Sequence, residues 1–373
     1  MVKAAFWSFA GLVIYTYVAY PILAWVLAQR RGREKLIGGL GKTRVTVIVA
    51  ARNECAVIGD RLANLAEMSM PSEMVEIIVA SDGSTDGTNE IVSAWPDKRV
   101  RLLALPRGGR ALAHNRAVEV ATGDIVVFTD ADTAFHKDCV PNLIRWFADP
   151  RVGCVVGRLS YVAERHTLGG QTALYWEYET KLREWESDAG LLVVGSGCCM
   201  AVRRNLFEGL HPDEDGDDAI PLDVLLQGYR VVFAPNAVAF DAPPLSPRDE
   251  VRARARMTVL AFTAILRRKV LLNPLRFPKP ALSVLSHRIL RFLTPVLVAG
   301  AFVTNTILVG EPLYRVLFGL QCLGYGLGTI GLVARAQDCP IAIVRLCTTF
   351  CVWNIGFAGG LVRVLRGHTV TTY

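Results

Sequence analysis

The sequence lacks the two phosphate-binding loops that are most common in parallel-sheet proteins. No Gly-x-Gly-x-x-Gly pattern follows the first predicted strand, Val45–Ala50, and no glycine-rich loop ends in the lysine of an ATPase P-loop. Dinucleotide-binding and P-loop functions are therefore disfavoured.

Cysteine occurs nine times, but without the paired spacing of a metal site. Cys198 and Cys199 are adjacent, and the others are scattered, several of them in apolar runs. We interpret them as reduced thiols in cytoplasmic or membrane-embedded surroundings.

Long apolar runs are abundant. Of the 373 residues, 52% are hydrophobic, and the mean hydropathy of +0.33 is too high for a wholly soluble chain of this length. Ala4–Ala28 could span a bilayer, and the basic cluster after it predicts a retained anchor whose C-terminal end is cytoplasmic. Three further spans are predicted late in the chain: Phe292–Val309, Leu313–Val333 and Ile341–Leu361.

The charges beside these runs predict a multi-pass protein of the inner (plasma) membrane with its globular domain in the cytoplasm. The last span is expected either to cross or to be re-entrant: if it crosses, Arg363 and Arg366 lie outside, which opposes the charge rule. We expect four regions: an N-terminal anchor with its basic flank (1–40), a globular domain (41–265), an interfacial segment (266–290) and C-terminal membrane helices (291–373). The net charge of +7 fits contact with lipid or nucleotide phosphates. Nucleic acid is not expected as a partner, since the basic residues cluster near the spans.

Strands and helices alternate between the first and second spans. Strands are predicted at Val45–Ala50, Glu76–Ala80, Val100–Ala104 and from Ile125, with a helix at Ala111–Ala121. Four β-α repeats predict an α/β domain with a mostly parallel sheet and right-handed crossovers. A later strand is expected at Leu191–Gly195.

Two carboxylates, Asp130 and Asp132, leave the strand from Ile125 side by side. Such a pair repels itself unless a cation lies between them, which suggests Mg²⁺ or Mn²⁺ shared with a phosphorylated substrate. Glu54 and Asp82 should lie on the same edge, because parallel strands present their carboxyl ends together. Arg107 and Arg110 flank two glycines and could approach phosphate oxygens. Asp86 is expected to cap a helix.

The ordered series resembles a family 2 glycosyltransferase over roughly residues 45–257. It consists of Ala51-Arg52-Asn53-Glu54, Asp82-Gly83-Ser84-Thr85-Asp86-Gly87-Thr88, Gly108-Gly109-Arg110 with Asn115, and Asp130-Ala131-Asp132. The resemblance implies a Rossmann-like GT-A fold, inversion at the anomeric carbon, and a nucleotide-sugar donor bound near Ala51 and Asn53. By it, Glu54 and Asp82 hold the uracil or ribose, Asp130 touches the ribose or donor sugar, and Asp132 coordinates the metal. Ser81 and Arg110 stand where the family often has Asp and Lys.

An acidic run, Asp213–Asp218, precedes a predicted helix and the sequence Gly228-Tyr229-Arg230. A solvated acidic loop is the default interpretation. The family resemblance instead makes the second acid of a pair the general base, which implies Asp218, with Asp217 in reserve.

Arg252, Arg254 and Arg256 stand where similar processive enzymes have Gln-x-x-Arg-Trp. Arg256 aligns with the family's arginine and could neutralise the leaving diphosphate. The Gln and Trp are absent, which argues against a platform for a growing polymer.

We therefore expect a metal-dependent hexosyltransferase of polysaccharide or cell-envelope synthesis, acting from a UDP-sugar on a lipid-linked or glycan acceptor. Three alternatives stay open: a processive synthase that also translocates its polymer, an inactive sugar-binding or scaffold subunit, and a sugar nucleotidyltransferase. The last would need a glycine-rich, basic loop where Ala51-Arg52-Asn53-Glu54 stands.

Overall fold

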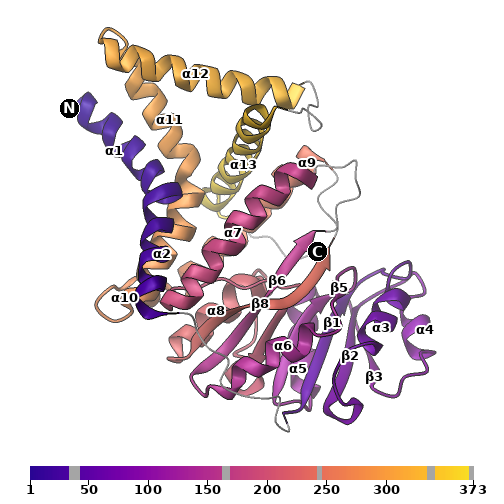
Figure 1. Cartoon of the computed structure of the whole chain (residues 1–373). Helices are drawn as coiled ribbons and strands as arrows, with labels where there is room; N and C mark the ends of the chain where they lie inside the picture. Colours follow the sequence, from indigo (N-terminus) through magenta and orange to yellow (C-terminus); the bar gives the residue numbers. More distant parts are fainter. Residues whose placement is uncertain (33–42, 162–168, 242–245, 334–340, 369–373) are drawn as a thin grey trace.

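The structure is a computed structural model that describes residues 1–32, 43–161, 169–241, 246–333 and 341–368, with the side chains of 161–176 excepted. A domain built on a β-sheet lies at one end, and a group of long apolar helices extends from it (Figure 1).

The sheet has eight strands in the order β3-β2-β1-β4-β7-β6-β8-β5. Their bounds are β1 Val45–Ala51, β2 Val75–Asp82, β3 Val100–Leu105, β4 Ile125–Asp130, β5 Ala134–Phe135, β6 Val152–Tyr161, β7 Met200–Arg203 and β8 Arg230–Asp241. Strands β3, β2, β1 and β4 are mutually parallel, and β6 is parallel to β8. β7 runs antiparallel to β4 and β6, and β5 antiparallel to β8. The predicted mostly parallel α/β sheet is confirmed.

Helices cover both faces of this sheet, which explains why every residue of β1 is buried. The domain helices are α3 Ile58–Ala66, α4 Thr88–Ser93, α5 Arg110–Val120, α6 Cys139–Ile144, α7 Gly169–Ala189, α8 Gly216–Leu226 and α9 Pro247–Arg267. One core packs α3 and α6 on the sheet around Leu62 and Leu143, and the other packs α5, α8 and α9 around Phe128.

The strand predicted at Leu191–Gly195 is wrong. The segment is buried, but it forms no strand. The Gly195 N–H donates instead to the Asp217 carbonyl at 2.7 Å, so the segment is fastened to the start of α8.

Four described helices are long and apolar enough to cross a membrane, one N-terminal and three C-terminal, as predicted. The first joins α1 Val2–Ile14, the π-helical turn η1 Tyr15–Ala19 and α2 Tyr20–Arg31. The second joins α10 Pro278–Ser283, the π-helical turn η6 Val284–Ile289 and α11 Leu290–Leu308. The others are α12 Pro312–Val333 and α13 Ala342–Leu365.

The region predicted as an interfacial segment divides in two. A short 3₁₀ turn, Lys269–Leu272, follows α9, and the second apolar helix then begins at Pro278. A proline is tolerated there because the first helical turn has unpaired N–H groups in any case. Residues 278–290 are therefore continuous with α11.

The C-terminal half of α13 packs against the domain helix α9. A Cβ atom at Gly360 would lie 2.5 Å from Thr258 Cβ and 2.8 Å from the Ala255 carbonyl oxygen, so the two helices approach closely. In Figure 1, α12 crosses the far ends of α11 and α13, and α13 returns toward the sheet. The C-terminal part of α13, which ends just after Arg363, therefore lies beside the domain helix α9.

This close approach gives the first prediction. Gly360→Ala should lower the apparent Tm of the detergent-solubilised protein by at least about 2 °C, because the added methyl group overpacks the α9–α13 contact. Gly319→Ala on α12 is the matched control, since no atom lies within 4 Å of its added Cβ. Equal Tm values for the two variants would show that this helix contact is dispensable.

Candidate functional site

Most of the residues predicted for the site meet at the carboxyl edge of the sheet. Ala51, Asp82 and Asp130 are the last residues of β1, β2 and β4. Burial raises the pKa of Glu54, and the nearby carboxylates of Asp132 and Asp130 raise it further. Glu54, Asp130 and Asp132 therefore form one group of like charges.

The loops after β1 and β2 brace each other. Asn53 has φ +56°, and its Oδ1 accepts from the Thr85 N–H at 2.9 Å. The Glu54 N–H donates to Thr88 Oγ1 at 2.9 Å. Asp86 accepts from the N–H groups of Thr88 at 3.1 Å and Cys55 at 3.0 Å. Gly87 is the N-cap of α4, and Asp86 just before it binds the first N–H of the helix, so it lies one residue earlier than an N-cap. Asp86 also fixes the backbone beside Glu54.

Asp82 supports the loop before α5. Its carboxylate accepts from the Gly108 N–H at 2.6 Å and the Gly109 N–H at 3.0 Å, and the residue is 1% exposed. In this structure the Asp82 carboxylate is buried and occupied by the loop backbone, so it is not available to a nucleoside. Arg107, on the same loop, is exposed.

Arg110 is the first residue of α5, and Gly109 before it has φ +91°. The Arg110 guanidinium pairs with the Asp130 carboxylate. Burial raises the pKa of Asp130, Arg110 lowers it, and Asp132 raises it again. A cation at the start of α5 is thus directed at the end of β4.

Asp217 reaches the same place from the first turn of α8. A Cβ atom at Gly197 would clash with the Asp217 carboxylate and lie 2.9 Å from Arg110 Nη2, so both groups lie against this glycine. Burial raises the pKa of Asp217 to about 8, with Asp215, Asp218 and Asp130 adding to the rise and Arg110 opposing it. Within the described chain, its buried Oδ1 has no hydrogen-bond partner.

Asp218 has different neighbours. It is 6% exposed and ion-paired with Arg288 of η6. Burial raises the pKa of Asp218, and Arg288 opposes the rise. The adjacent acids Asp217 and Asp218 therefore face different cations.

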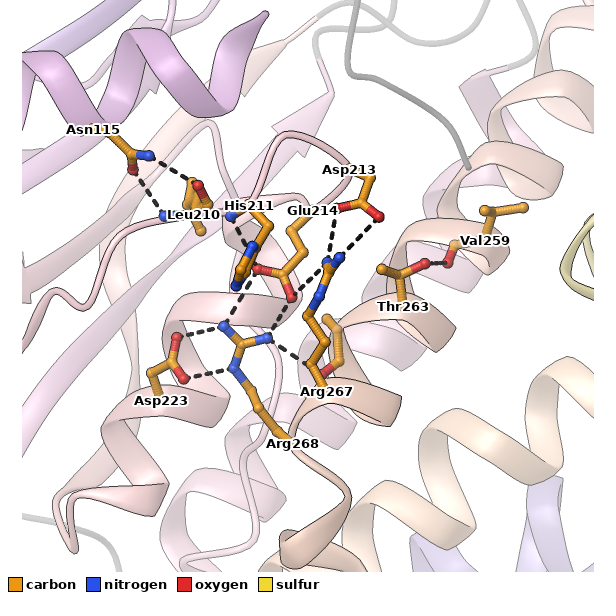
Figure 2. A network of polar contacts seen from close by, with 11 residues as sticks. Asn115, Leu210, His211, Asp213, Glu214, Asp223, Val259, Thr263, Arg267 and Arg268 are labelled. Atoms are coloured by element: carbon orange, nitrogen blue, oxygen red, sulfur yellow. Dashed lines mark hydrogen bonds and ion pairs between the residues drawn. The ribbon is translucent and has the colours of Figure 1, made fainter. Parts of the chain in front are cut away.

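The acidic run before α8 is not a solvated loop throughout. Figure 2 shows Arg268 between Glu214 and Asp223: its guanidinium reaches both Asp223 oxygens at 2.6 Å and Glu214 Oε1 at 2.7 Å. Burial would raise the pKa of Glu214, but Arg268 brings it below its usual value. The interpretation of Asp213–Asp218 as a solvated loop is therefore wrong at Glu214, which is 1% exposed.

The other end of the same loop is held by Asn115 of α5. Its side-chain amide donates to the Leu210 carbonyl and accepts from the Leu210 N–H, both at 2.8 Å (Figure 2). The segment that carries Asp217 is therefore fixed from α5 on one side and α9 on the other.

Arg252 and Arg254 of α9 pair with acids of their own helix, not with the carboxylates of the site. Arg256 is exposed, and in the described residues no ion pair joins it to a carboxylate of the site. Arg254 pairs with Glu250 at 2.7 Å and lies 4.3 Å from the Trp353 ring centroid. Arg288 is the cation beside the acidic pair. We missed it in the sequence because a basic residue before a predicted span is also typical of a cytoplasmic flank.

Across the residues that the structure describes, no group of three His, Cys, Asp or Glu side chains forms a complete metal site. The crowding of Glu54, Asp130 and Asp132 nevertheless fits a hard divalent cation, because Asp132 raises the pKa of both Glu54 and Asp130, and all three offer oxygen ligands. A protein site of two carboxylates would leave the other positions to water and substrate oxygens.

Residues 46–210 match the family model described as "Glycosyl transferase family 2". The chain is 27% identical over 229 residues to the probable glycosyltransferase YdaM of Bacillus subtilis, covering 57% of this chain and 54% of the relative. It is also 27% identical over 208 residues to the poly-β-1,6-N-acetyl-D-glucosamine synthase of Staphylococcus aureus, covering 54% and 50%. The chain thus spans about half the length of these curated relatives.

One solved structure matches almost the whole chain. The mannosyltransferase PcManGT from Pyrobaculum calidifontis, solved with GDP-Man and Mn²⁺, superposes with a TM-score of 0.72. The match covers 98% of this chain and 99% of that protein at 24% identity, so the two share a fold that includes the apolar helices. The expected GT-A fold is confirmed.

The Glu214–Arg268–Asp223 contact gives the second prediction. Arg268→Met should lower the free energy of unfolding by about 3–5 kcal/mol, because it leaves Asp223 without its cation and the buried Glu214 with Arg267 alone. Arg267→Met is the matched control: Arg267 is more exposed, and its pairs with Asp213 and Glu214 should together contribute about 1 kcal/mol or less, because Arg268 still holds Glu214. Denaturant unfolding of the two variants measures the difference, and similar losses would contradict the account.

Proposed function

We propose that this chain, whose residues 46–210 match the family 2 glycosyltransferase model, transfers a sugar from a nucleoside-diphosphate sugar to a lipid-linked or glycan acceptor at the membrane surface. The observation that best supports this proposal is the meeting of Arg110, Asp130 and Asp217 beside Gly197. A phosphate-binding cation, a sugar-binding carboxylate and a buried base are there within reach of one substrate. We also propose that the domain faces the cytoplasm, in a multi-pass protein of the inner membrane.

The donor is proposed to be a UDP-sugar, the class implied by the family. Ala51, Asn53 and Glu54 would contact the nucleoside from the braced β1 loop, and Asp130 the ribose or the donor sugar. Arg110, together with the exposed Arg107, would neutralise the diphosphate through charge-assisted hydrogen bonds. Asp82 is reassigned from nucleoside contact to holding the Gly108–Gly109 backbone, which positions Arg110.

Asp132 and Asp130 would hold Mg²⁺ or Mn²⁺. A bound divalent ion would supply positive charge that offsets the diphosphate leaving group. The related mannosyltransferase structure contains Mn²⁺. Arg110 would add fixed positive charge without reorganising as the bond breaks. Arg256, exposed on α9, stays a candidate for the same role.

Asp217 is the stronger candidate for the general base. It lies against the same glycine as Arg110, whereas Asp218 is engaged by Arg288. The acceptor hydroxyl would form a new bond to the anomeric carbon and pass its proton to Asp217. The bond from that carbon to the nucleoside diphosphate would break on the opposite face, and its electron pair would leave with the phosphate oxygen.

The donor assignment gives the third prediction. The purified full chain should release nucleoside diphosphate from one or more members of a panel of UDP-, GDP- and dTDP-sugars, and UDP-sugars should be the best substrates. EDTA should abolish the release and added Mn²⁺ or Mg²⁺ should restore it, because the diphosphate would otherwise meet an uncompensated carboxylate group. Persistent full turnover after chelation would exclude the metal assignment.

The base assignment gives the fourth prediction. Asp217→Asn should lower kcat by about 10²–10⁴-fold, and by at least about tenfold more than Asp218→Asn, because it removes the proton acceptor. Wild-type kcat/KM should rise with pH toward about 8, since Asp217 must lose its own proton before it can accept another. The reverse ranking of the two variants would return the base role to Asp218.

A further inference from the structure

The membrane end of the site contains two arginines that the proposed chemistry does not use. Arg288, in η6, pairs with Asp218 and lies 5.1 Å from the Phe292 ring centroid. Arg183, on α7, is half-buried, and its charge lowers the pKa of Asp218. Both guanidinium groups therefore lie near one carboxylate.

Contacts on either side of Arg183 fix the face of α7 on which it lies. Glu179, one turn earlier, pairs with Arg291 at 2.6 Å, and Glu186, one turn later, meets His287 Nδ1 at 2.7 Å. Residues spaced by three and four lie on one side of a helix. Arg183 accordingly lies on the face of α7 that packs against η6 and α11.

The π-helical turn brings Arg288 into the same junction. His287 and Arg288 are adjacent, and neighbours on a regular α-helix point about 100° apart. Accordingly, His287 contacts α7 and Arg288 contacts α8. Both side chains are mostly enclosed, with exposed fractions of 3% and 15%. π-helical turns of this kind occur frequently at functional sites.

The junction has unused hydrogen-bond donors. In the described residues, Arg183 Nε and Arg288 Nε are buried and have no hydrogen-bond partner. Leaving a buried charged donor unpaired is costly, so such groups usually have a ligand or water. A phosphate oxygen is an acceptor of the kind that these two buried Nε–H donors lack.

We propose that Arg183 and Arg288 bind a phosphate group of the acceptor, and that the acceptor is a saccharide carried on a lipid phosphate or diphosphate. This inference rests on the proposed function and chooses between its two acceptor classes. Arginine binds phosphate through paired N–H groups of fixed geometry. Arg288 also lies within the first half of a candidate membrane span, Pro278–Leu308, so a lipid-borne phosphate could reach it from the membrane side.

The residues around Arg288 also place the proposed phosphate site where the domain meets the apolar helices. Glu186, which meets His287, also accepts from the Tyr20 hydroxyl of α2 at 2.6 Å. The phosphate would therefore lie between the catalytic domain and the two helices α2 and α11. Because Asp217 and Asp218 are adjacent, the acceptor hydroxyl that passes its proton to Asp217 would belong to a sugar close to the lipid phosphate.

The test compares two acceptors that bear the same monosaccharide, one on a short polyprenyl diphosphate and one as an uncharged alkyl glycoside. The full chain is purified in nanodiscs, and sugar transfer is measured with radiolabelled donor. Arg183→Gln and Arg288→Gln should each raise the KM for the diphosphate acceptor about tenfold. The loss of kcat/KM should be at least tenfold larger for this acceptor than for the alkyl glycoside. Arg252→Gln is the control, since Arg252 is 79% exposed and distant in sequence from both elements.

Arg183→Gln leaves the Arg288–Asp218 pair intact, so it tests the idea even if Arg288→Gln does not fold. Equal losses on both acceptors, or a wild-type preference for the alkyl glycoside, would overturn the phosphate site. In that case continued nucleoside diphosphate release would leave the proposed function standing. Absence of release from every donor would instead contradict the proposed function itself.

Discussion

Repulsion between carboxylates at one edge of the sheet is the constraint on which this structure depends. Parallel strands bring their carboxyl ends together, so acids that are distant in sequence become neighbours. Fixed cations offset part of this charge: Arg110 pairs with Asp130, and Arg288 pairs with Asp218. Burial raises the pKa values of Glu54, Asp130 and Asp217, and neighbouring carboxylates raise each of them further. A site with this residual charge is suited to a cation and to the phosphates that the cation accompanies.

The loops of the site are held by other loops and by buried ion pairs. Asn53 and Asp86 join the β1 and β2 loops, and Asp82 holds the loop that precedes Arg110. Arg268, at the C-terminal end of α9, holds Glu214 in the segment before Asp217. Such support reduces the reorganisation needed during the reaction, which is how preorganised charges contribute to catalysis.

The membrane helices are part of this architecture. Arg288 belongs to an apolar helix yet completes the surroundings of Asp218, and α13 packs on α9 through Gly356 and Gly360. A polar network joins Glu186 of α7 to Tyr20 of α2 and His287 of η6. Domain and helices therefore form one structure, which fits a reaction in which a soluble donor meets an acceptor held in the membrane.

Local patterns predicted most of the fold. Residues 45–49 are all β-branched, so the strand Val45–Ala51 was evident, and the four apolar spans followed from length and hydropathy. Leu191–Gly195 was misassigned because an apolar run does not reveal whether its backbone pairs with a sheet or, as at Gly195, with a helix start. The acids of the site were found because they follow strands. Their partners were not, since Arg183, Arg268 and Arg288 reach them from other elements and resemble ordinary surface or flanking charges in the sequence.

The central claim is that Asp132 and Asp130 bind a divalent cation together with a nucleoside diphosphate. Electron paramagnetic resonance of free Mn²⁺ tests it without requiring turnover or an identified acceptor. The account predicts that the full chain removes Mn²⁺ from solution more strongly when UDP is added, and that Asp132→Ala abolishes this increase. Undiminished UDP-dependent Mn²⁺ binding by Asp132→Ala would contradict it.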